Sequence, residues 1–268
     1  MLGFLRILFR IPLIALSILI LVISWALPWI VWRFSARAGS HLRVRLMGIW
    51  ARAALRIMGF RVQCEGTPPK VPFFLVTNHL SYMDVLVLWG QVDVYFLGKA
   101  ELAQWPGIGP LIRAAGTMFI DRTRKTAVLP AVEAIKQRLA LGNGVVVFPE
   151  VTSSSGGRIL RLRRNMFEVA LRADMPVHVG CLHYEIPDTR YPVEMKLCWW
   201  GDMTFTDHLL GVFRIPRVNA RLRFAAEPVT GSSRRELAAK AADLMNEMFE
   251  PLHDWTLISP DDDDGIPE

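Results

Sequence analysis

The feature that most constrains this chain is an uncharged apolar segment near its N-terminus. Residues 11–32 form 22 consecutive positions without Asp, Glu, Lys or Arg. As a helix rising about 1.5 Å per residue, the segment is roughly 33 Å long, enough to cross the hydrocarbon layer of a bilayer. Trp25, Trp29 and Trp32 gather at its C-terminal end, as interfacial aromatic residues do. We therefore expect residues 1–60 to form a membrane anchor followed by a basic amphipathic helix.

The apolar segment has two alternatives to a spanning helix. A secretory signal peptide has a shorter apolar region and ends at a small-x-small cleavage site, and neither description fits here. A re-entrant segment does fit, because Pro12 and Pro28 interrupt the apolar run and arginines flank both of its ends. Since the basic flanks lie on both sides, the positive-inside rule assigns no orientation. Spanning and re-entrant arrangements both stay open.

The distribution of charge also favours a lipid surface. Hydrophobic residues make up 52% of the chain and its mean hydropathy is +0.28, values that are high for a soluble domain. Before Glu65 the sequence contains no acidic residue and no lysine. It contains nine arginines, at positions 6, 10, 33, 37, 43, 45, 52, 56 and 61. Because apolar residues separate them, these arginines suit anionic lipid head groups better than nucleic acid, and we expect no nucleic-acid partner.

Residues 41–58 are predicted to form a helix. At 100° per residue, Arg45, Arg52 and Arg56 fall in one narrow sector of that helix. A helix of this kind lies in the plane of the lipid head groups. The alternative is a surface helix that packs on the globular domain.

The rest of the chain alternates between strand and helix patterns. We expect an α/β domain over residues 61–257, with a mixed, largely parallel central sheet flanked by helices. Strands are predicted at 61–65, 73–77, 94–97, 117–120, 144–148, 176–182, 193–199 and 218–225. Helices are predicted at 81–91, 107–115, 125–141, 165–173 and 204–213, with a last helix that Ser232 or Ser233 and Glu236 cap. Residues 258–268 are acidic and are expected to be disordered.

The stretch from Thr77 to Asp84 carries the strongest chemical signal. It lies between an apolar strand and a helix, so His79 and Asp84 are placed at a strand-to-helix junction. A carboxylate bonded to one ring nitrogen of a histidine fixes its tautomer and stabilises the imidazolium. We hypothesise that this pair deprotonates an alcohol; the alternative is a structural histidine. A second H-x4-D spacing, His183 and Asp188, is typical of a strand end and a turn, and we interpret it as chance.

Two further strand ends carry polar residues. Residues 116–122 end in Asp121 and Arg122, where a guanidinium can bind a phosphate in bidentate fashion, or where the two residues form a structural pair. Residues 145–156 run from an apolar strand into Glu150 and then into a loop rich in hydroxyl groups and glycine. Such a loop offers donors to an anion or a hydroxylated substrate, or it is a solvated turn.

Taken together and in this order, the motifs resemble those of the glycerolipid acyltransferase family, which acylates lysophosphatidic acid and related lysolipids. Asn78-His79-x4-Asp84 is similar to its first motif, residues 116–122 to its second and Phe148-Pro149-Glu150-x-Thr152 to its third. Lys99, Glu101-Leu102 and Pro106-x-Ile108-Gly109 look like its linking sequence, and Met175-Pro176-Val177 looks like its fourth motif. The resemblance covers roughly residues 45–230 and implies that the domain at 61–257 is an acyltransferase domain.

The resemblance implies a mechanism without a covalent enzyme intermediate. His79 is the expected general base and Asp84 orients it, while the acceptor hydroxyl attacks an acyl thioester of CoA or acyl carrier protein. The expected substrate-binding residues are Asn78, Lys99, Arg122, Glu150, Thr152 and Ser153. We expect no metal and no cofactor. The sequence has no G-x-S-x-G nucleophile elbow, and Cys64, Cys181 and Cys198 have no metal-binding or paired spacing. The implied location is the bacterial inner membrane, with the catalytic domain on the cytoplasmic side.

Three departures from the family pattern bear on the acceptor. Val151 stands where typical phosphatidate-forming members have glycine, Ser153 where they have arginine, and Gly180 where the fourth motif has its second proline. Arginines 158, 161, 163 and 164 offset the lost positive charge or face the membrane. The loop at 153–156 and residues 199–203 are more similar to a bacterial branch that acylates lyso-ornithine lipid. The family as a whole implies an acceptor similar to lysophosphatidic acid. These departures keep two alternatives open, a non-phosphate lysolipid such as lyso-ornithine lipid and a catalytically silent lipid-binding protein.

Overall fold

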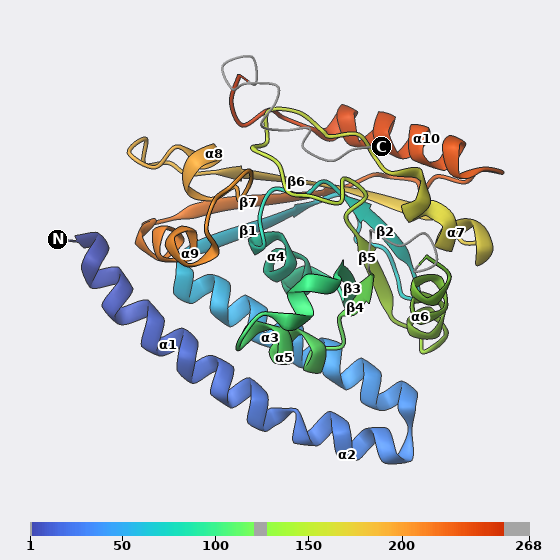
Figure 1. The fold of residues 1–268 in the computed structure, drawn as a ribbon, viewed down its shortest axis with the longest axis horizontal. Helices are drawn as coiled ribbons and strands as arrows, with labels where there is room; N and C mark the ends of the chain where they lie inside the picture. The colour runs from blue at the N-terminus through green and yellow to red at the C-terminus, as the bar shows by residue number, and fades with distance from the viewer. Residues whose placement is uncertain (1, 121–127, 255–268) are drawn as a thin grey trace.

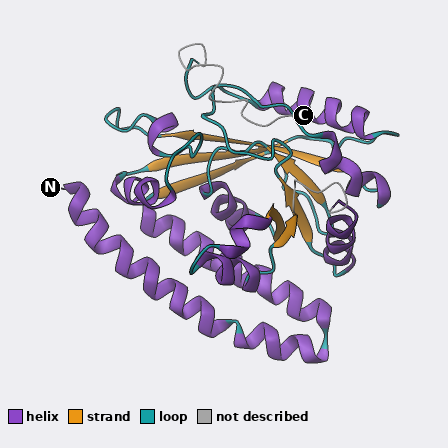
Figure 2. Ribbon diagram, viewed as in Figure 1, coloured by secondary structure: helices purple, strands orange, loops and turns teal. Residues whose placement is uncertain are grey.

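The structure is a computed structural model that describes residues 2–120 and 128–254. Its centre is a seven-stranded sheet with the strand order β1-β7-β6-β2-β5-β3-β4 (Figures 1 and 2). Neighbouring strands are parallel except β6 and β7, which are antiparallel. The strands are β1 (Phe60–Glu65), β2 (Phe74–Thr77), β3 (Val94–Lys99), β4 (Met118–Ile120), β5 (Gly144–Val147), β6 (Val177–Glu185) and β7 (Val218–Phe224). The prediction of a mixed, largely parallel sheet is confirmed.

Helices cover both faces of the sheet and create two hydrophobic cores. One core joins the sheet to α1 (Leu2–Ser24), α3 (Ala36–Met58), α4 (Met83–Gln91) and α9 (Phe205–Arg214). The other joins it to α6 (Val128–Ala140), α7 (Glu168–Arg172) and α10 (Arg234–Met248). The other helices among the described residues are α2 (Ala26–Phe34), α5 (Ile108–Ala114), α8 (Val193–Lys196), η1 (Ala100–Gln104) and η3 (Arg164–Phe167). Because the central strands are buried from both faces, their sequences are nearly continuous apolar runs.

The N-terminal helices form a hairpin against the domain. Helices α1 and α2 follow one another with a break at Trp25, and α3 then returns along them (Figure 1). Ser35 makes the turn in an extended conformation, and its hydroxyl accepts a hydrogen bond from the Ala38 N–H at the start of α3. Pro12 lies inside α1 and does not interrupt it. Among the described residues, one helical stretch, Leu2–Phe34, is long and apolar enough to cross a membrane.

The hairpin is fixed to the domain at both of its ends. Near the start of α1, the buried Arg10 guanidinium donates to three backbone carbonyls at the end of α9: Phe213 (2.9 Å), Ile215 (2.6 Å) and Pro216 (3.2 Å). At the other end, α3 leads directly into β1. Arg10 therefore stabilises the fold, which corrects the expectation that all nine N-terminal arginines serve lipid head groups.

Helix α3 packs on the globular domain. Its apolar side, which includes Met47, Ala51 and Leu55, is buried against the sheet and α4. The predicted arginine sector, Arg45, Arg52 and Arg56, is exposed on the opposite side. The packing that the alternative interpretation predicts is therefore present, and a position of the exposed arginine side in the head-group plane stays a prediction. The helix begins five residues earlier than predicted, at Ala36 rather than His41.

The predicted strand at 193–199 is wrong. The structure has one helical turn, α8, followed by an irregular segment in which Leu197 and Cys198 are completely buried. A short apolar run is compatible with any buried backbone, so the pattern does not distinguish a strand from a packed turn. The Trp199 N–H bonds instead to the carbonyl of Leu80, 2.9 Å away, in the loop that carries His79. The segment thus supports the candidate site.

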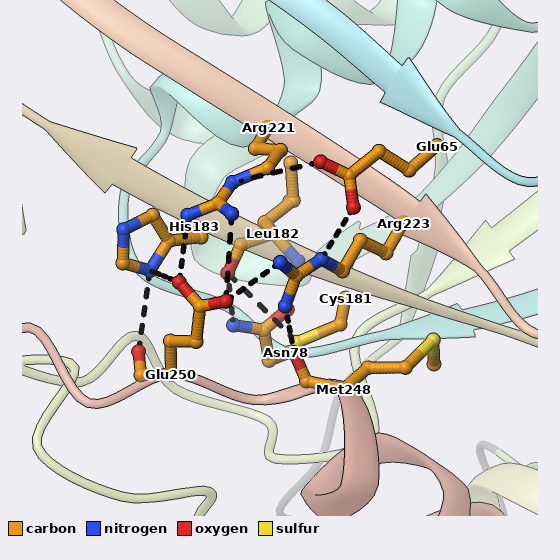
Figure 3. A network of polar contacts seen from close by, with 9 residues as sticks. All are labelled: Glu65, Asn78, Cys181, Leu182, His183, Arg221, Arg223, Met248 and Glu250. Carbon is orange, nitrogen blue, oxygen red and sulfur yellow. Dashed lines mark hydrogen bonds and ion pairs between the residues drawn. The ribbon is translucent and has the colours of Figure 1, made fainter.

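An ion-pair network fastens the segment after α10 to the sheet (Figure 3). The Glu250 carboxylate pairs with Arg221 and Arg223 of β7, at 2.6 Å in each case. Arg223 also pairs with Glu65 of β1, 2.7 Å away. Beyond this network, the Leu252 N–H donates to the Gly156 carbonyl and the Leu252 side chain lies against Gly156. We call residues 249–254 the C-terminal strap. The acidic tail beyond it lies outside the described residues.

Candidate active site

The candidate site begins at the carboxyl end of β2, the central strand of the sheet. After the fully buried strand β2, the chain turns through residues 78–82 before α4 begins at Met83. His79 Nδ1 lies 2.8 Å from Asp84 Oδ2. The Asp84 side chain is 0% exposed and that of His79 is 20% exposed. The predicted pair is therefore formed, with its carboxylate buried and its imidazole partly open.

Asp84 accepts three hydrogen bonds in addition to the one from His79. Oδ2 receives the backbone N–H groups of Leu80 (2.7 Å) and Ser81 (3.0 Å). Oδ1 receives the hydroxyl of Tyr184 at 2.7 Å. A buried carboxylate needs hydrogen-bond donors in place of the water it has lost, and these contacts supply them.

The imidazole of His79 is fixed in orientation and in tautomer. Its ring stacks on Phe148 with 4.0 Å between centroids and 15° between planes. Because a carboxylate only accepts, Nδ1 carries the proton that bonds to Asp84. Nε2 is then the nitrogen with a free lone pair, and in a neutral imidazole that lone pair can accept a proton.

Glu150 holds the backbone around His79. One of its oxygens accepts the N–H of His79 (2.9 Å) and the other accepts the N–H of Leu160 (3.0 Å). The side chain is buried, at 3% exposed. These contacts connect the first motif to the third. They give Glu150 a positioning task, and its predicted contact with the acceptor stays a prediction.

The loop after Glu150 is held in an unusual conformation. Val151 has φ of 61°, in the left-handed region where side chains with a Cβ are strained. The glycine that phosphatidate-forming members have at this position adopts such a φ without strain. The next residues bond back to the site: the Ser154 N–H donates to the carbonyl of His79 at 3.0 Å.

The other predicted substrate-binding residues have different surroundings. Asn78 is buried and its side-chain amide pairs with the backbone of Leu182, at 2.9 and 2.7 Å, so it joins β2 to β6. Ser153 donates its hydroxyl to the carbonyl of Trp199, and Thr152 lies beside it. Lys99 is half exposed at the end of β3 and pairs with Glu101 at 3.4 Å. Arg122 lies outside the described residues.

The second H-x4-D pair is not a pair in space. His183 Nδ1 bonds to the backbone carbonyl of Glu250 at 3.2 Å, while Asp188 pairs with Arg190 at 2.7 Å. The interpretation of this spacing as chance is confirmed. In the described parts of the chain, no group of three or more His, Cys, Asp or Glu side chains is arranged to hold a metal ion.

An aromatic cluster lies beside the loop that carries His79. Tyr82, Trp105, Trp199 and Phe205 contact one another edge to face, with centroids 5.0 to 6.2 Å apart. The Tyr82 hydroxyl lies 3.0 Å from His208 Nδ1, and His208 Nε2 lies 2.9 Å from the carbonyl of Cys198. Burial lowers the pKa of His208, which keeps this imidazole neutral, with Nε2 as donor and Nδ1 as acceptor.

Sequence reasoning missed Tyr184, Phe148 as the surface under the imidazole, and the supporting segment around Trp199. Tyr184 lies outside every motif, near the end of the longest strand. The only signal is its place in an apolar strand, which does not say what the hydroxyl meets. That contact depends on β6 lying beside β2 in the sheet.

Comparison with known proteins places the chain among enzymes. The family described as "Acyltransferase" matches residues 60–182. A lyso-ornithine lipid O-acyltransferase of Rhodobacter capsulatus is 32% identical over 196 residues, which cover 70% of this chain and 70% of that protein. This chain belongs to the acyltransferase family. The predicted family and an enzymatic function are thereby confirmed, because similarity of this extent reaches well beyond the motifs.

Other acyltransferases match over different lengths. A lyso-ornithine lipid O-acyltransferase of Rhizobium meliloti is 34% identical, and the match covers 62% of this chain and 60% of that protein, which is less than two thirds of its length. A 1-acyl-sn-glycerol-3-phosphate acyltransferase of Neisseria gonorrhoeae is 33% identical over 50% of this chain and 53% of its own length. The crystal structure of the acyltransferase PlsC from Thermotoga maritima superposes with a TM-score of 0.65 at 22% identity, covering 92% of this chain and 94% of that one. That likeness shows a shared fold.

Proposed function

We propose that this acyltransferase moves a fatty acyl group from a thioester of CoA or acyl carrier protein to the free hydroxyl of a lysolipid. The observation that carries the proposal is the His79–Asp84 pair, 2.8 Å apart, with a buried carboxylate and a partly exposed imidazole. This arrangement suits general-base catalysis, because Asp84 holds the Nδ1 proton and leaves Nε2 to take another.

The proposed reaction proceeds in two steps. His79 Nε2 takes the proton of the acceptor hydroxyl while the hydroxyl oxygen attacks the thioester carbonyl carbon. The C–S bond of the tetrahedral intermediate then breaks, and the sulfur leaves as a thiol with the proton that the imidazolium returns. Asp84 stabilises that imidazolium between the steps. The enzyme forms no covalent intermediate in this scheme, and it needs no cofactor besides the acyl donor.

We propose lyso-ornithine lipid as the acceptor, with lysophosphatidic acid as the second candidate. The Rhodobacter relative named for lyso-ornithine lipid matches 70% of the chain, whereas the Neisseria relative named for the phosphate acceptor matches 50%. Ser153, which replaces an arginine of phosphatidate-forming members, donates its hydroxyl to a backbone carbonyl rather than offering a charge. An acceptor without a phosphate has less need of that arginine.

The N-terminal hairpin supports a membrane-bound enzyme. The outer side of α1 exposes Leu5, Phe9, Leu16, Ile20 and Ile23, each by more than half. In water such a face is costly, so we propose that it lies in the hydrocarbon layer. Because α3 returns the chain to the domain, a re-entrant hairpin fits better than a single crossing. Acyl thioesters are cytosolic, which favours the cytoplasmic side of a bacterial inner membrane.

The test is acyl transfer by the purified full chain in mixed micelles. Labelled acyl-CoA and acyl carrier protein are offered with lyso-ornithine lipid or lysophosphatidic acid. His79→Ala and Asp84→Asn are expected to lower kcat about a thousandfold or more, because base and tautomer are lost. His183→Gln is the matched control, since it changes the other histidine of the same spacing and should retain activity.

The outcomes separate the acceptors and the mechanism. Product from lyso-ornithine lipid alone supports the proposed acceptor, and product from lysophosphatidic acid alone replaces it with the second candidate. Near-normal turnover by His79→Ala contradicts the proposed mechanism.

A further inference from the structure

Tyr184 lies outside every sequence motif, yet its side chain reaches the His79–Asp84 pair. It lies near the end of β6, in the part that pairs with β7, and it is 1% exposed. Its hydroxyl is 2.7 Å from Asp84 Oδ1. The two backbone N–H groups and His79 all bond to the other oxygen, Oδ2. Within the described residues, Tyr184 is therefore the donor that satisfies Oδ1.

The surroundings of Asp84 make this hydrogen bond important. The described residues place no lysine or arginine in an ion pair with Asp84, so hydrogen bonds carry the stabilisation of its charge. Two other titratable groups are close. Burial raises the pKa of the Cys198 thiol well above its ordinary value and keeps it neutral. Glu150 faces the backbone of His79 and Leu160 with both oxygens. Neither group replaces the Tyr184 hydroxyl.

We propose that Tyr184 is a positioning residue for the acyl transfer and acts through Asp84. Its hydroxyl keeps the buried carboxylate ionised and turns Oδ2 toward His79. The inference rests on the proposed function, since His79 must be the base for this orientation to affect turnover. The tyrosine hydroxyl is a reliable donor in this place, because burial and the neighbouring Asp84 charge raise the pKa of Tyr184 and keep the proton on it.

Removing the hydroxyl has a defined consequence for protonation. In Tyr184→Phe, Oδ1 has no donor, so the negative charge of Asp84 is less stabilised. The carboxylate and imidazole together then hold an additional proton more tightly. The base is consequently blocked at a higher pH than in the wild type.

The experiment compares Tyr184→Phe with Tyr95→Phe in the full chain. Tyr95 is also 1% exposed, and its hydroxyl lies 2.9 Å from the Ser40 hydroxyl. Its side chain belongs to the hydrophobic core that does not contain Tyr184. Both variants lose one buried hydroxyl, so both are expected to lower Tm. Only Tyr184→Phe should move the acidic limb of the kcat/KM profile to higher pH, by about one unit, which lowers turnover about tenfold below the limb. The KM for each substrate should stay unchanged.

A second measurement does not depend on turnover. The ring of His79 is followed by NMR from pH 5 to 9, with His79→Ala to assign its signal. The titration midpoint should rise in Tyr184→Phe and stay at the wild-type value in Tyr95→Phe. An unchanged midpoint and limb in Tyr184→Phe, or an equal change in Tyr95→Phe, overturns the inference. A raised midpoint in a protein that acylates neither acceptor supports Tyr184 and counts against the proposed function instead.

Discussion

At the scale of the residue, the loop after Glu150 shows how a site is held in a strained form. Val151 has a φ of 61°. Left-handed backbone costs a residue with a Cβ about 1 kcal/mol or more, and it costs glycine almost nothing. The strain is tolerated because Glu150 and Ser154, on either side, bond to the backbone of His79.

Val151→Gly and Val151→Ala test this strain as a matched pair. Both remove the packing of the valine side chain, but only glycine relieves the left-handed conformation. We expect Val151→Gly to be more stable than Val151→Ala by about 1 kcal/mol, measured by thermal unfolding in detergent. Elsewhere in a folded chain the order is usually the reverse. A more stable alanine variant would mean that the loop relaxes without strain.

At the scale of the element, Arg10 joins the first helix to the end of α9. Its guanidinium donates hydrogen bonds to the carbonyls of Phe213, Ile215 and Pro216. These carbonyls lie at the C-terminal end of α9, where a cation is favourable. In the sequence this arginine belongs to a basic flank of an apolar segment. The contacts give it a structural task instead.

Arg10→Ala is expected to destabilise the protein by about 2–3 kcal/mol, because buried carbonyls lose a charged donor. Arg33→Ala is the control, since Arg33 is exposed on α2, and its effect should stay within about 0.5 kcal/mol. Thermal unfolding in the same detergent measures both. Equal effects of the two substitutions would mean that Arg10 contributes only charge.

The C-terminal strap gives a second element-scale prediction. The Arg223 guanidinium, through its hydrogen bond, holds the pKa of the Glu250 carboxyl below its ordinary value of 4.5. Because the pKa is lower in the folded protein than in the unfolded chain, the ionised carboxylate stabilises the fold at pH values above the pKa of the unfolded state. That stability is lost as the pH falls below about 4.5.

Glu250→Gln should therefore be less stable than wild type at pH 7, by about 1 kcal/mol or less for a partly exposed network. The difference should disappear toward pH 3. Glu247→Gln, on the exposed side of α10 and without an ion pair in the described part of the chain, should show no such difference at either pH. A gap between wild type and Glu250→Gln that persists at low pH would mean that packing, and not charge, holds the strap.

At the scale of the whole molecule, the N-terminal hairpin bears on the proposed membrane contact of the enzyme. The exposed apolar side of α1 gives the molecule one face suited to lipid, and α3 connects that face to the domain. If that face lies in the hydrocarbon layer, as proposed, a lysolipid acceptor would reach the domain without leaving the bilayer surface.

The double variant Phe9→Glu and Ile20→Glu should weaken binding to anionic vesicles about tenfold or more, since two apolar contacts become charges. The matched control is Val71→Glu with Leu171→Glu, two exposed apolar residues outside the hairpin. Flotation of the protein with vesicles measures both. Unchanged binding of the first variant would mean that another face carries the membrane contact.

The sequence by itself determined the long apolar N-terminal helical stretch, the α/β alternation and the His79–Asp84 pair. These features are local. A continuous apolar run, a period of hydrophobicity and a spacing of five residues each predict the structure of only one or two neighbouring elements. It also marked Val151 as a departure, because a left-handed loop position has a local residue preference.

Only the tertiary structure decided which distant groups complete those local features. Tyr184 meets Asp84 because β6 lies next to β2, and Arg10 meets the end of α9 because the hairpin folds onto the domain. The apolar run at 193–199 is a helical turn and an irregular segment, because tertiary packing buries its apolar side chains without a neighbouring strand. Contacts between residues a hundred or more positions apart depend on the order of strands and the packing of helices, and no local pattern encodes that order.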